Sequence, residues 1–287
     1  MPEFSVVIPV YNAAGTLEET LLSVDNQRFR DFEVIIVDDG STDESPEIIA
    51  RWKENTELPV RALRHENTGL GASRNRGTEA AMANWVAFLD ADDLWDPRKL
   101  QIVRRFISPA KFRGVIYHRV INFEGPRNYP RAIRAVKSKR DLLINANPLV
   151  PSATVIDREI ALRFPFSEDR KLHGAEDLHL WVRLIDEGIP FHFERDAVTK
   201  YRMRGGMSSD LESHLRYVFN ALKALREEGI IDADTEQVAI SRKHYEAGRF
   251  YQKHGEFARA REHYKKGLVR GALARSLIVA NRLRLRL

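Results

Sequence analysis

Short apolar runs alternate with helical segments over residues 5–89, and this alternation constrains the fold more than any other feature of the chain. The apolar runs occupy residues 5–10, 32–37, 59–64 and 84–89, and the segments with helical spacing occupy residues 16–27, 42–55 and 71–83. The runs at residues 5–10 and 32–37 are rich in Val and Ile, as is typical of buried parallel strands. Strands that alternate with helices pair in parallel through right-handed crossovers. The sequence therefore predicts an α/β fold built on a parallel sheet.

The first helical segment carries a local starting signal. Thr16 precedes its apolar residues, and Glu19 follows three positions later. This spacing predicts a capping box, in which the two side chains bond the free N–H groups of the first turn.

The fourth apolar run ends in three acids, Asp90, Asp92 and Asp93, within four positions. Open α/β sheets bind ligands at the carboxyl edge of their strands, and carboxylates gathered there repel one another unless a cation lies between them. Hard divalent ions take oxygen ligands and bridge to phosphates. The pattern predicts a metal and diphosphate site. The alternative is a solvated turn that leads to a helix cap at Asp96.

Other segments converge on the same edge of the predicted sheet. Residues 9–12 follow the first strand and residues 38–42 follow the second, while the loop 66–75 leads into the third helix. Gly69 and Gly71 permit a close backbone approach, and a helix start offers N–H groups to an anion. Each segment alone can be explained as a turn. Together they have the order that a nucleotide-diphosphate site requires.

Composition narrows the class of protein. The chain has 287 residues, 46 basic and 41 acidic side chains, a net charge of +5 and no cysteine. This length fits one large domain with a smaller unit. The absence of cysteine excludes disulfides and thiolate metal sites, and no apolar run approaches the roughly 20 residues of a membrane span. Because the first residues also lack the features of a signal peptide, we expect a cytoplasmic protein.

Six segments, taken in order, resemble the motifs of the family 2 inverting glycosyltransferases, which have the GT-A fold. They are residues 5–12, 37–43, 67–75, 88–93, 174–181 and 201–208. The resemblance covers residues 4–208 and implies a nucleotide-diphospho-sugar transferase fold, with a mostly parallel sheet flanked by helices. It implies a hexosyl- or N-acetylhexosaminyltransferase that moves a sugar from a UDP-sugar to an acceptor hydroxyl by metal-assisted single displacement. The motifs do not identify the sugar.

The resemblance also implies a donor site. Its nucleotide contacts would be Pro9, Tyr11, Asn12, Asp39, Asn67, Gly71, Arg74, Asp90 and Ala91. Among these, Tyr11 and Asp39 would hold the uracil base and Asp90 the ribose. Asp92 would ligate Mn²⁺ or Mg²⁺, which neutralises charge on the leaving diphosphate.

On the acceptor side, the resemblance implies that Asp177 is the base that removes the proton of the acceptor hydroxyl. Glu176 would contact the acceptor, and Arg202 and Arg204 would contact the acceptor or the diphosphate. Acids in the first turn of a helix can also simply complement the helix dipole. Many family members carry a histidine in this loop, near the position where this chain has Arg204. Arginine cannot ligate a metal, but its planar fork can pair with a diphosphate.

The alternation of strands and helices stops near residue 209, and this change predicts two parts. Residues 1–208 would form the GT-A domain, with a nucleotide-binding half at 1–95 and an acceptor-binding half at 96–208. Residues 209–287 would form a helical region. Within it, residues 247–267 resemble one tetratricopeptide repeat, for which we expect a hairpin that turns at Gly255 with Ala260 at the closest approach. The basic tail suggests peripheral docking to the inner face of a membrane, and the helices suggest a homodimer.

The partners follow from this interpretation. We expect a UDP-sugar donor and a carbohydrate or lipid-linked acceptor, as in the synthesis of surface polysaccharide or glycolipid. We expect no nucleic acid, because no nucleic-acid-binding motif accompanies the basic run at 111–140. Two alternatives remain open, a sugar nucleotidyltransferase and a non-catalytic interaction module. The first needs a Gly-rich loop after the first strand, which residues 9–12 lack, and the second would tolerate loss of Asp92 and Asp177.

Overall fold

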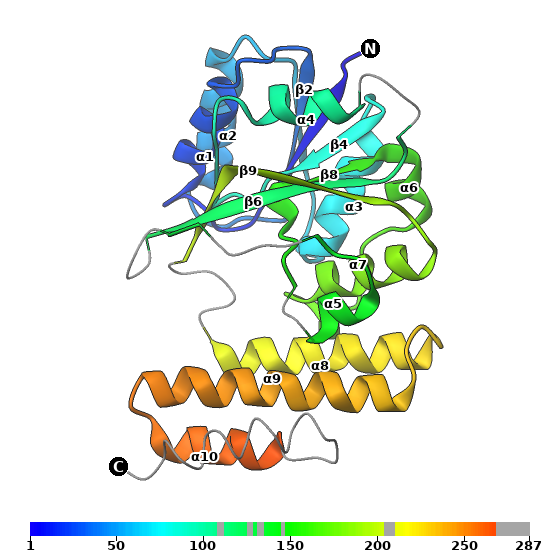
Figure 1. Cartoon of the computed structure of the whole chain (residues 1–287). Coiled ribbons are helices and arrows are strands. Elements are labelled where there is room, and N and C mark those ends of the chain that lie inside the picture. Colours follow the sequence, from blue (N-terminus) through cyan, green and yellow to red (C-terminus); the bar gives the residue numbers. More distant parts are fainter. Residues whose placement is uncertain (108–111, 125–128, 131–134, 145–146, 204–209, 268–287) are drawn as a thin grey trace.

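The computed structural model describes residues 1–107, 112–124, 129–130, 135–144, 147–203 and 210–267. Within these residues lies one nine-stranded sheet of order β3-β2-β1-β4-β8-β6-β9-β5, with β7 paired to β6 (Figure 1). The strands are β1 (Phe4–Val10), β2 (Phe32–Asp38), β3 (Val60–Arg64), β4 (Trp85–Phe88), β5 (Leu94–Trp95), β6 (Val115–Phe123), β7 (Tyr129–Pro130), β8 (Thr154–Asp157) and β9 (Phe191–Arg202).

The predicted α/β fold is confirmed, and the sheet is mixed. Strand β1 pairs in parallel with β2 and β4, and β2 pairs in parallel with β3. In the second half β8 runs antiparallel to β4 and β6, while β9 runs parallel to β6. The first four strands therefore end at one edge, as the alternation predicted.

Helices cover both faces of the sheet. They are α1 (Leu17–Asp25), α2 (Ser45–Asn55), α3 (Leu70–Ala80), α4 (Lys99–Ile107), α5 (Lys139–Ile144), α6 (Arg158–Arg163), α7 (Glu176–Asp186), α8 (Leu211–Glu227), α9 (Ala233–Lys253) and α10 (Phe257–Lys266), with short 3-10 turns at Pro151–Ala153 and Arg170–Leu172. Val6 and Ile8 of β1 pack in the core beneath α1, α2 and α4, while Val7 belongs to the core on the opposite face. Successive side chains of a strand point to opposite faces, so one run of apolar residues serves both cores.

The predicted capping box is wrong. Thr16 is the N-cap residue of α1, but its side chain accepts no hydrogen bond from the first turn. Its hydroxyl donates instead to the Ala91 carbonyl at 2.9 Å. Glu19 pairs with Arg202 at 2.7 Å between Oε2 and a terminal guanidinium nitrogen. Both side chains therefore tie α1 to segments far along the chain.

Helices α8, α9 and α10 stack below the sheet in Figure 1, with α8 nearest to α7. Leu215, Val218 and Leu222 of α8 are buried in the same core as α7. Helices α9 and α10 form the expected antiparallel hairpin, and Gly255 turns it with φ +79°. Ala260 is buried. A further close approach occurs at Gly248, where an added Cβ would lie 2.6 Å from the Tyr264 ring.

The likeness to a tetratricopeptide repeat stays a prediction, as does the division at residues 95 and 208. The basic tail lies outside the described residues. In the described part of the chain, none of the helices combines the length and the apolar character that crossing a bilayer requires.

Candidate active site

The loops after β1 and β2 are bound to each other. The Asn12 N–H donates to Ser41 Oγ at 3.0 Å, and Asn12 Oδ1 accepts from the Thr42 N–H at 2.8 Å. Asn12 has φ +48°, a conformation that asparagine tolerates better than most residues. The neighbouring Tyr11 side chain is half exposed. Asn12 therefore positions both loops, and Tyr11 offers an aromatic face beside them.

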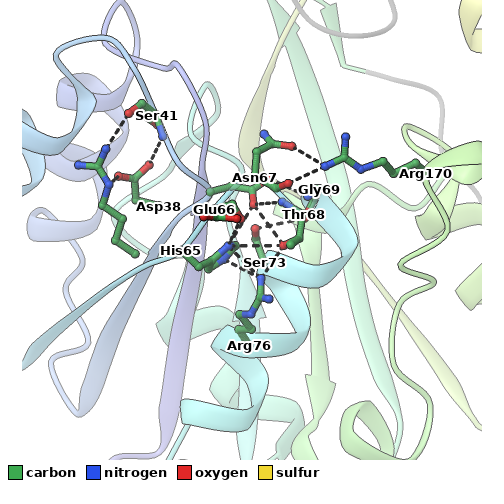
Figure 2. A network of polar contacts seen from close by, with 12 residues as sticks. Asp38, Ser41, His65, Glu66, Asn67, Thr68, Gly69, Ser73, Arg76 and Arg170 are labelled. Atoms are coloured by element: carbon green, nitrogen blue, oxygen red, sulfur yellow. Dashed lines mark hydrogen bonds and ion pairs between the residues drawn. The ribbon is translucent and has the colours of Figure 1, made fainter.

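Asp39 connects this pair of loops to the start of α3. Its Oδ1 accepts the Thr68 N–H at 2.8 Å, and its Oδ2 accepts the Gly69 N–H at 2.9 Å. Figure 2 shows the loop with His65, whose Nδ1 lies 3.3 Å from Asp39 Oδ1. Oδ1 is also approached by the Thr68 hydroxyl at 3.4 Å, whereas Oδ2 has one described hydrogen bond and keeps acceptor capacity for a ligand.

Arg170 reaches this loop from the second half of the domain (Figure 2). One of its terminal nitrogens donates to the Asn67 carbonyl at 2.5 Å and lies 3.3 Å from Asn67 Oδ1. Gly71 lies close by, where an added Cβ would come within 2.3 Å of the Ser167 carbonyl oxygen. The structure therefore explains Gly71 by close packing of α3 against Ser167, and its expected nucleotide contact stays a prediction.

The acids after β4 have different surroundings. Asp93 is buried, and its Oδ1 accepts the Arg202 N–H at 2.9 Å. Burial, reinforced by the charges of Asp92 and Asp90, raises the pKa of Asp93 well above its usual range. Asp92 is only partly buried. Burial and then the Asp90 charge raise the pKa of Asp92 to about 6. Asp93 therefore anchors the end of β9, and Asp92 is the more exposed of these two acids.

Backbone contacts hold the segment that bears these acids. The Asp90 N–H donates to Ser152 Oγ at 3.0 Å. The Ala91 carbonyl accepts hydrogen bonds from the hydroxyls of Thr16 and Thr20 at 2.9 and 3.0 Å. The segment is thus fixed from both sides, and no local pattern in the sequence indicates the role of Ser152.

Arg74 joins the donor-side and acceptor-side acids. It lies in α3, is 1% exposed and is bonded by its two terminal nitrogens to Asp90 Oδ1 and Glu176 Oε1, each at 2.7 Å. The Phe166 ring centroid lies 5.1 Å from the guanidinium carbon. This bridge spans 102 residues of sequence and brings the end of β4 to the start of α7.

Glu176 and Asp177 are the first two residues of α7, and their carboxylates differ in burial and in the hydrogen bonds that they accept. Glu176 is buried, and its second oxygen accepts the Gly174 N–H at 2.6 Å, so both carboxylate oxygens are bonded. Asp177 is partly exposed, and its Oδ1 accepts the Leu178 N–H at 2.7 Å. Burial, with the Glu176 charge second, raises the pKa of Asp177 to about 7. An acid with that pKa can take and release a proton near neutral pH.

Arg202 is engaged by the protein. Its Nε donates to the Asp92 carbonyl at 2.7 Å, and its terminal nitrogens pair with Glu19 and Glu124. A diphosphate contact would require Arg202 to leave these partners, and that contact stays a prediction. Arg204 lies outside the described residues.

The acids fit a metal that arrives with a nucleotide. In the described ranges no three His, Asp or Glu side chains are arranged as a ready-made metal site. Mg²⁺ and similar ions are commonly bound by one or two carboxylates plus substrate phosphates. The Asp92 carboxylate accepts a hydrogen bond from its own backbone N–H and from none of the described side chains. Together with Asp90, two residues earlier, it supplies that donor set.

Comparison with known proteins places this geometry in a family. Residues 5–168 match the model of glycosyl transferase family 2. An uncharacterized glycosyltransferase of Nostoc sp. is 40% identical over 116 residues, which are 40% of this chain and 36% of that protein. The chain thus spans about a third of that relative's length. The putative teichuronic acid biosynthesis glycosyltransferase TuaG of Bacillus subtilis is 29% identical over 70% of this chain and 79% of its own. The amylovoran biosynthesis glycosyltransferase AmsB of Erwinia amylovora is 31% identical over 70% of this chain and 69% of its own.

Solved structures share the fold. Residues 1–349 of TarS from S. aureus, in complex with UDP-GlcNAc, superpose with a TM-score of 0.66 at 21% identity, over 93% of this chain and 81% of that one. The mannosyltransferase PcManGT of Pyrobaculum calidifontis, in complex with GDP-Man and Mn²⁺, gives 0.63 at 22% identity, over 99% and 80%. The family model covers more than half of the sequence, and these likenesses agree with the GT-A fold that the motifs implied. The chain therefore belongs to glycosyl transferase family 2.

Proposed function

We propose that this chain is a metal-assisted, inverting glycosyltransferase that moves a sugar from a UDP-linked donor to an acceptor hydroxyl. The observation that carries the proposal is the bridge through Arg74. Its two contacts of 2.7 Å bring Asp90 close to Glu176. Asp90 lies two residues before the proposed metal ligand Asp92, and Glu176 directly precedes the proposed base Asp177. Donor chemistry and acceptor chemistry therefore share one site.

For the donor, we propose that Tyr11 and Asp39 hold the base and that Asp90 binds the ribose. Pro9, Asn12, Asn67, Gly71 and Ala91 shape this side. The bound divalent ion would supply charge neutralisation of the leaving diphosphate. The solved structures that contain UDP-GlcNAc, or GDP-Man with Mn²⁺, support a nucleotide-sugar donor with a metal for this chain as well.

For the acceptor, we propose that Asp177 accepts the hydroxyl proton as the oxygen attacks the anomeric carbon. Attack from the face opposite to the diphosphate inverts the configuration there. Glu176 is a poorer base, because both of its oxygens already accept hydrogen bonds. We propose that Glu176 helps to hold the acceptor side, and that Arg202 and Arg204 contact the diphosphate or the acceptor.

We propose an acceptor that is a growing carbohydrate or a lipid-linked sugar. Support comes from relatives named for teichuronic acid and amylovoran biosynthesis. Membrane contact through the basic tail and a dimer through the C-terminal helices remain predictions. The surviving acids Asp92 and Asp177 count against a non-catalytic module.

A panel of UDP- and GDP-sugars, assayed for slow hydrolysis with Mn²⁺, Mg²⁺ or a chelator, tests the proposal. We expect one UDP-sugar to be hydrolysed only with metal. Asp92→Ala should lose the metal dependence of UDP binding. Asp177→Asn should keep UDP affinity and lose about 10²–10⁴-fold in rate, the usual contribution of a general base. Hydrolysis of no sugar nucleotide under any condition, or full activity of Asp177→Asn, would refute the proposed chemistry.

A further inference from the structure

The first turn of α7 lacks the usual means of fixing a helix start. Its N-cap residue is Ala175, which has no side chain that could bond the free N–H groups. Gly174, just before it, has φ +82°, a conformation that favours glycine. Some other contact must therefore fix the turn that carries Asp177.

Glu176 provides that contact through both of its oxygens. Oε2 accepts the Gly174 N–H at 2.6 Å and closes the turn locally. Oε1 accepts from Arg74 at 2.7 Å and ties the turn to α3. Because Glu176 and Asp177 are consecutive residues, fixing the first carboxylate also limits where the second can point.

The same guanidinium holds Asp90 on its other side at 2.7 Å. The guanidinium group of Arg74 is rigid and planar, and its two terminal nitrogens can bond two carboxylates at once. It is also buried and stacked near Phe166, with the ring centroid 5.1 Å away, so it has little freedom to move. One side chain therefore connects the donor-side acid directly to the acceptor-side turn.

We propose that Arg74 is a positioning residue that holds the Asp177 turn at a fixed place relative to the donor site, rather than chiefly a contact to the nucleotide. This inference rests on the proposed function. It differs from the family resemblance, which implied a donor contact for Arg74. In this proposal Asp177 removes the proton and Asp92 serves the metal and diphosphate. Arg74 holds their neighbours Asp90 and Glu176 at the separation that its two terminal nitrogens allow.

The experiment measures metal-dependent hydrolysis of the UDP-sugar found by the panel, together with calorimetric binding of UDP and Mn²⁺. Arg74→Gln should bind UDP within about threefold of wild type and hydrolyse about 10²-fold more slowly, the cost of a misplaced reacting group. Glu176→Gln should lose a similar factor, since water replaces the acceptor in this assay. The double variant should be no slower than the slower single variant, because both changes break one bridge.

Arg74→Lys keeps the charge but lacks the fork, so its rate should lie between those of wild type and Arg74→Gln. The matched control is Arg61→Gln, which removes the cation 3.0 Å from the buried Glu33. Both residues lie near the amino ends of β2 and β3, away from the strand ends that carry the site. It should lower the melting temperature and leave the rate of the folded enzyme unchanged. Thermal unfolding of every variant shows whether it is folded at the assay temperature.

Several outcomes would overturn the inference. They are a loss of UDP affinity in Arg74→Gln as large as its loss of rate, losses that multiply in the double variant, and full activity of Arg74→Lys. If wild type itself hydrolyses no sugar nucleotide, the proposed function fails. If wild type is active and Arg74→Gln behaves like the Arg61→Gln control, only the positioning role fails.

Discussion

Replacing Glu176 with glutamine should move the pH dependence of turnover to lower pH. Asp177 must be ionised to accept a proton, and its pKa is raised from an ordinary 3.8 to about 7 by burial and then by the Glu176 charge. The rate should therefore rise with pH through this region in the wild-type enzyme. Glu176→Gln removes a negative charge and frees Arg74, and both changes favour the ionised form of Asp177.

The size of the shift follows from the charge removed. Neighbouring charges commonly move a carboxyl pKa by about one unit or more. An acid of pKa 7 is about one-tenth ionised at pH 6, and an acid of pKa 6 is about half ionised there. Relative to its own plateau, Glu176→Gln should thus be about fivefold more active at pH 6 than wild type. Its plateau should be lower, because the bridge to Arg74 is weakened.

The assay is hydrolysis of the UDP-sugar between pH 5 and 8 at saturating metal and donor. A bound cation would lower the pKa of Asp177 in both enzymes, so the difference between the midpoints of the two profiles is the test. Asp177→Asn is the control and should show a low rate without this rise. An unchanged or higher midpoint in Glu176→Gln would refute the assignment of the rise to Asp177.

Three further predictions concern the scaffold. Gly71→Ala should destabilise the protein by about 1–3 kcal/mol, because the new Cβ would lie 2.3 Å from the Ser167 carbonyl oxygen. Thermal unfolding measures this loss, and the control is Gly15→Ala, whose Cβ would meet no atom within 4 Å. Gly248→Ala would normally favour a helix, but its Cβ would lie 2.6 Å from the Tyr264 ring. It should lower the melting temperature, and a smaller side chain at Tyr264 should restore it; a stabilised single variant would contradict the packing. Truncation after residue 209 exposes the core that α8 covers, so we expect insoluble protein in a solubility and size-exclusion assay. A folded, monodisperse truncated enzyme would show that the helices are independent.

Local sequence patterns predicted the framework of the site. The apolar runs of β1 to β4 end where the sequence changes to Asp, Gly and Asn, and parallel strands bring such ends to one edge. The turn at Gly255 depends on one glycine with positive φ. The start of α8 depends on Asp210, whose side chain accepts hydrogen bonds from N–H groups of the first turn. Periodicity and turn chemistry act over a few residues, so they can be read from the sequence alone.

Contacts between distant segments needed the tertiary structure. Thr16 and Glu19 have the spacing of a capping box, yet they bond Ala91 and Arg202, because these partners come within reach only when the sheet has formed. The pairing of Asp90 with Glu176 through Arg74 likewise joins residues up to 102 positions apart and leaves no periodic signal. The sequence alone determined which acids gather at the edge of the sheet. The tertiary structure decided which of them are already bonded to other residues, because those partners lie far along the sequence.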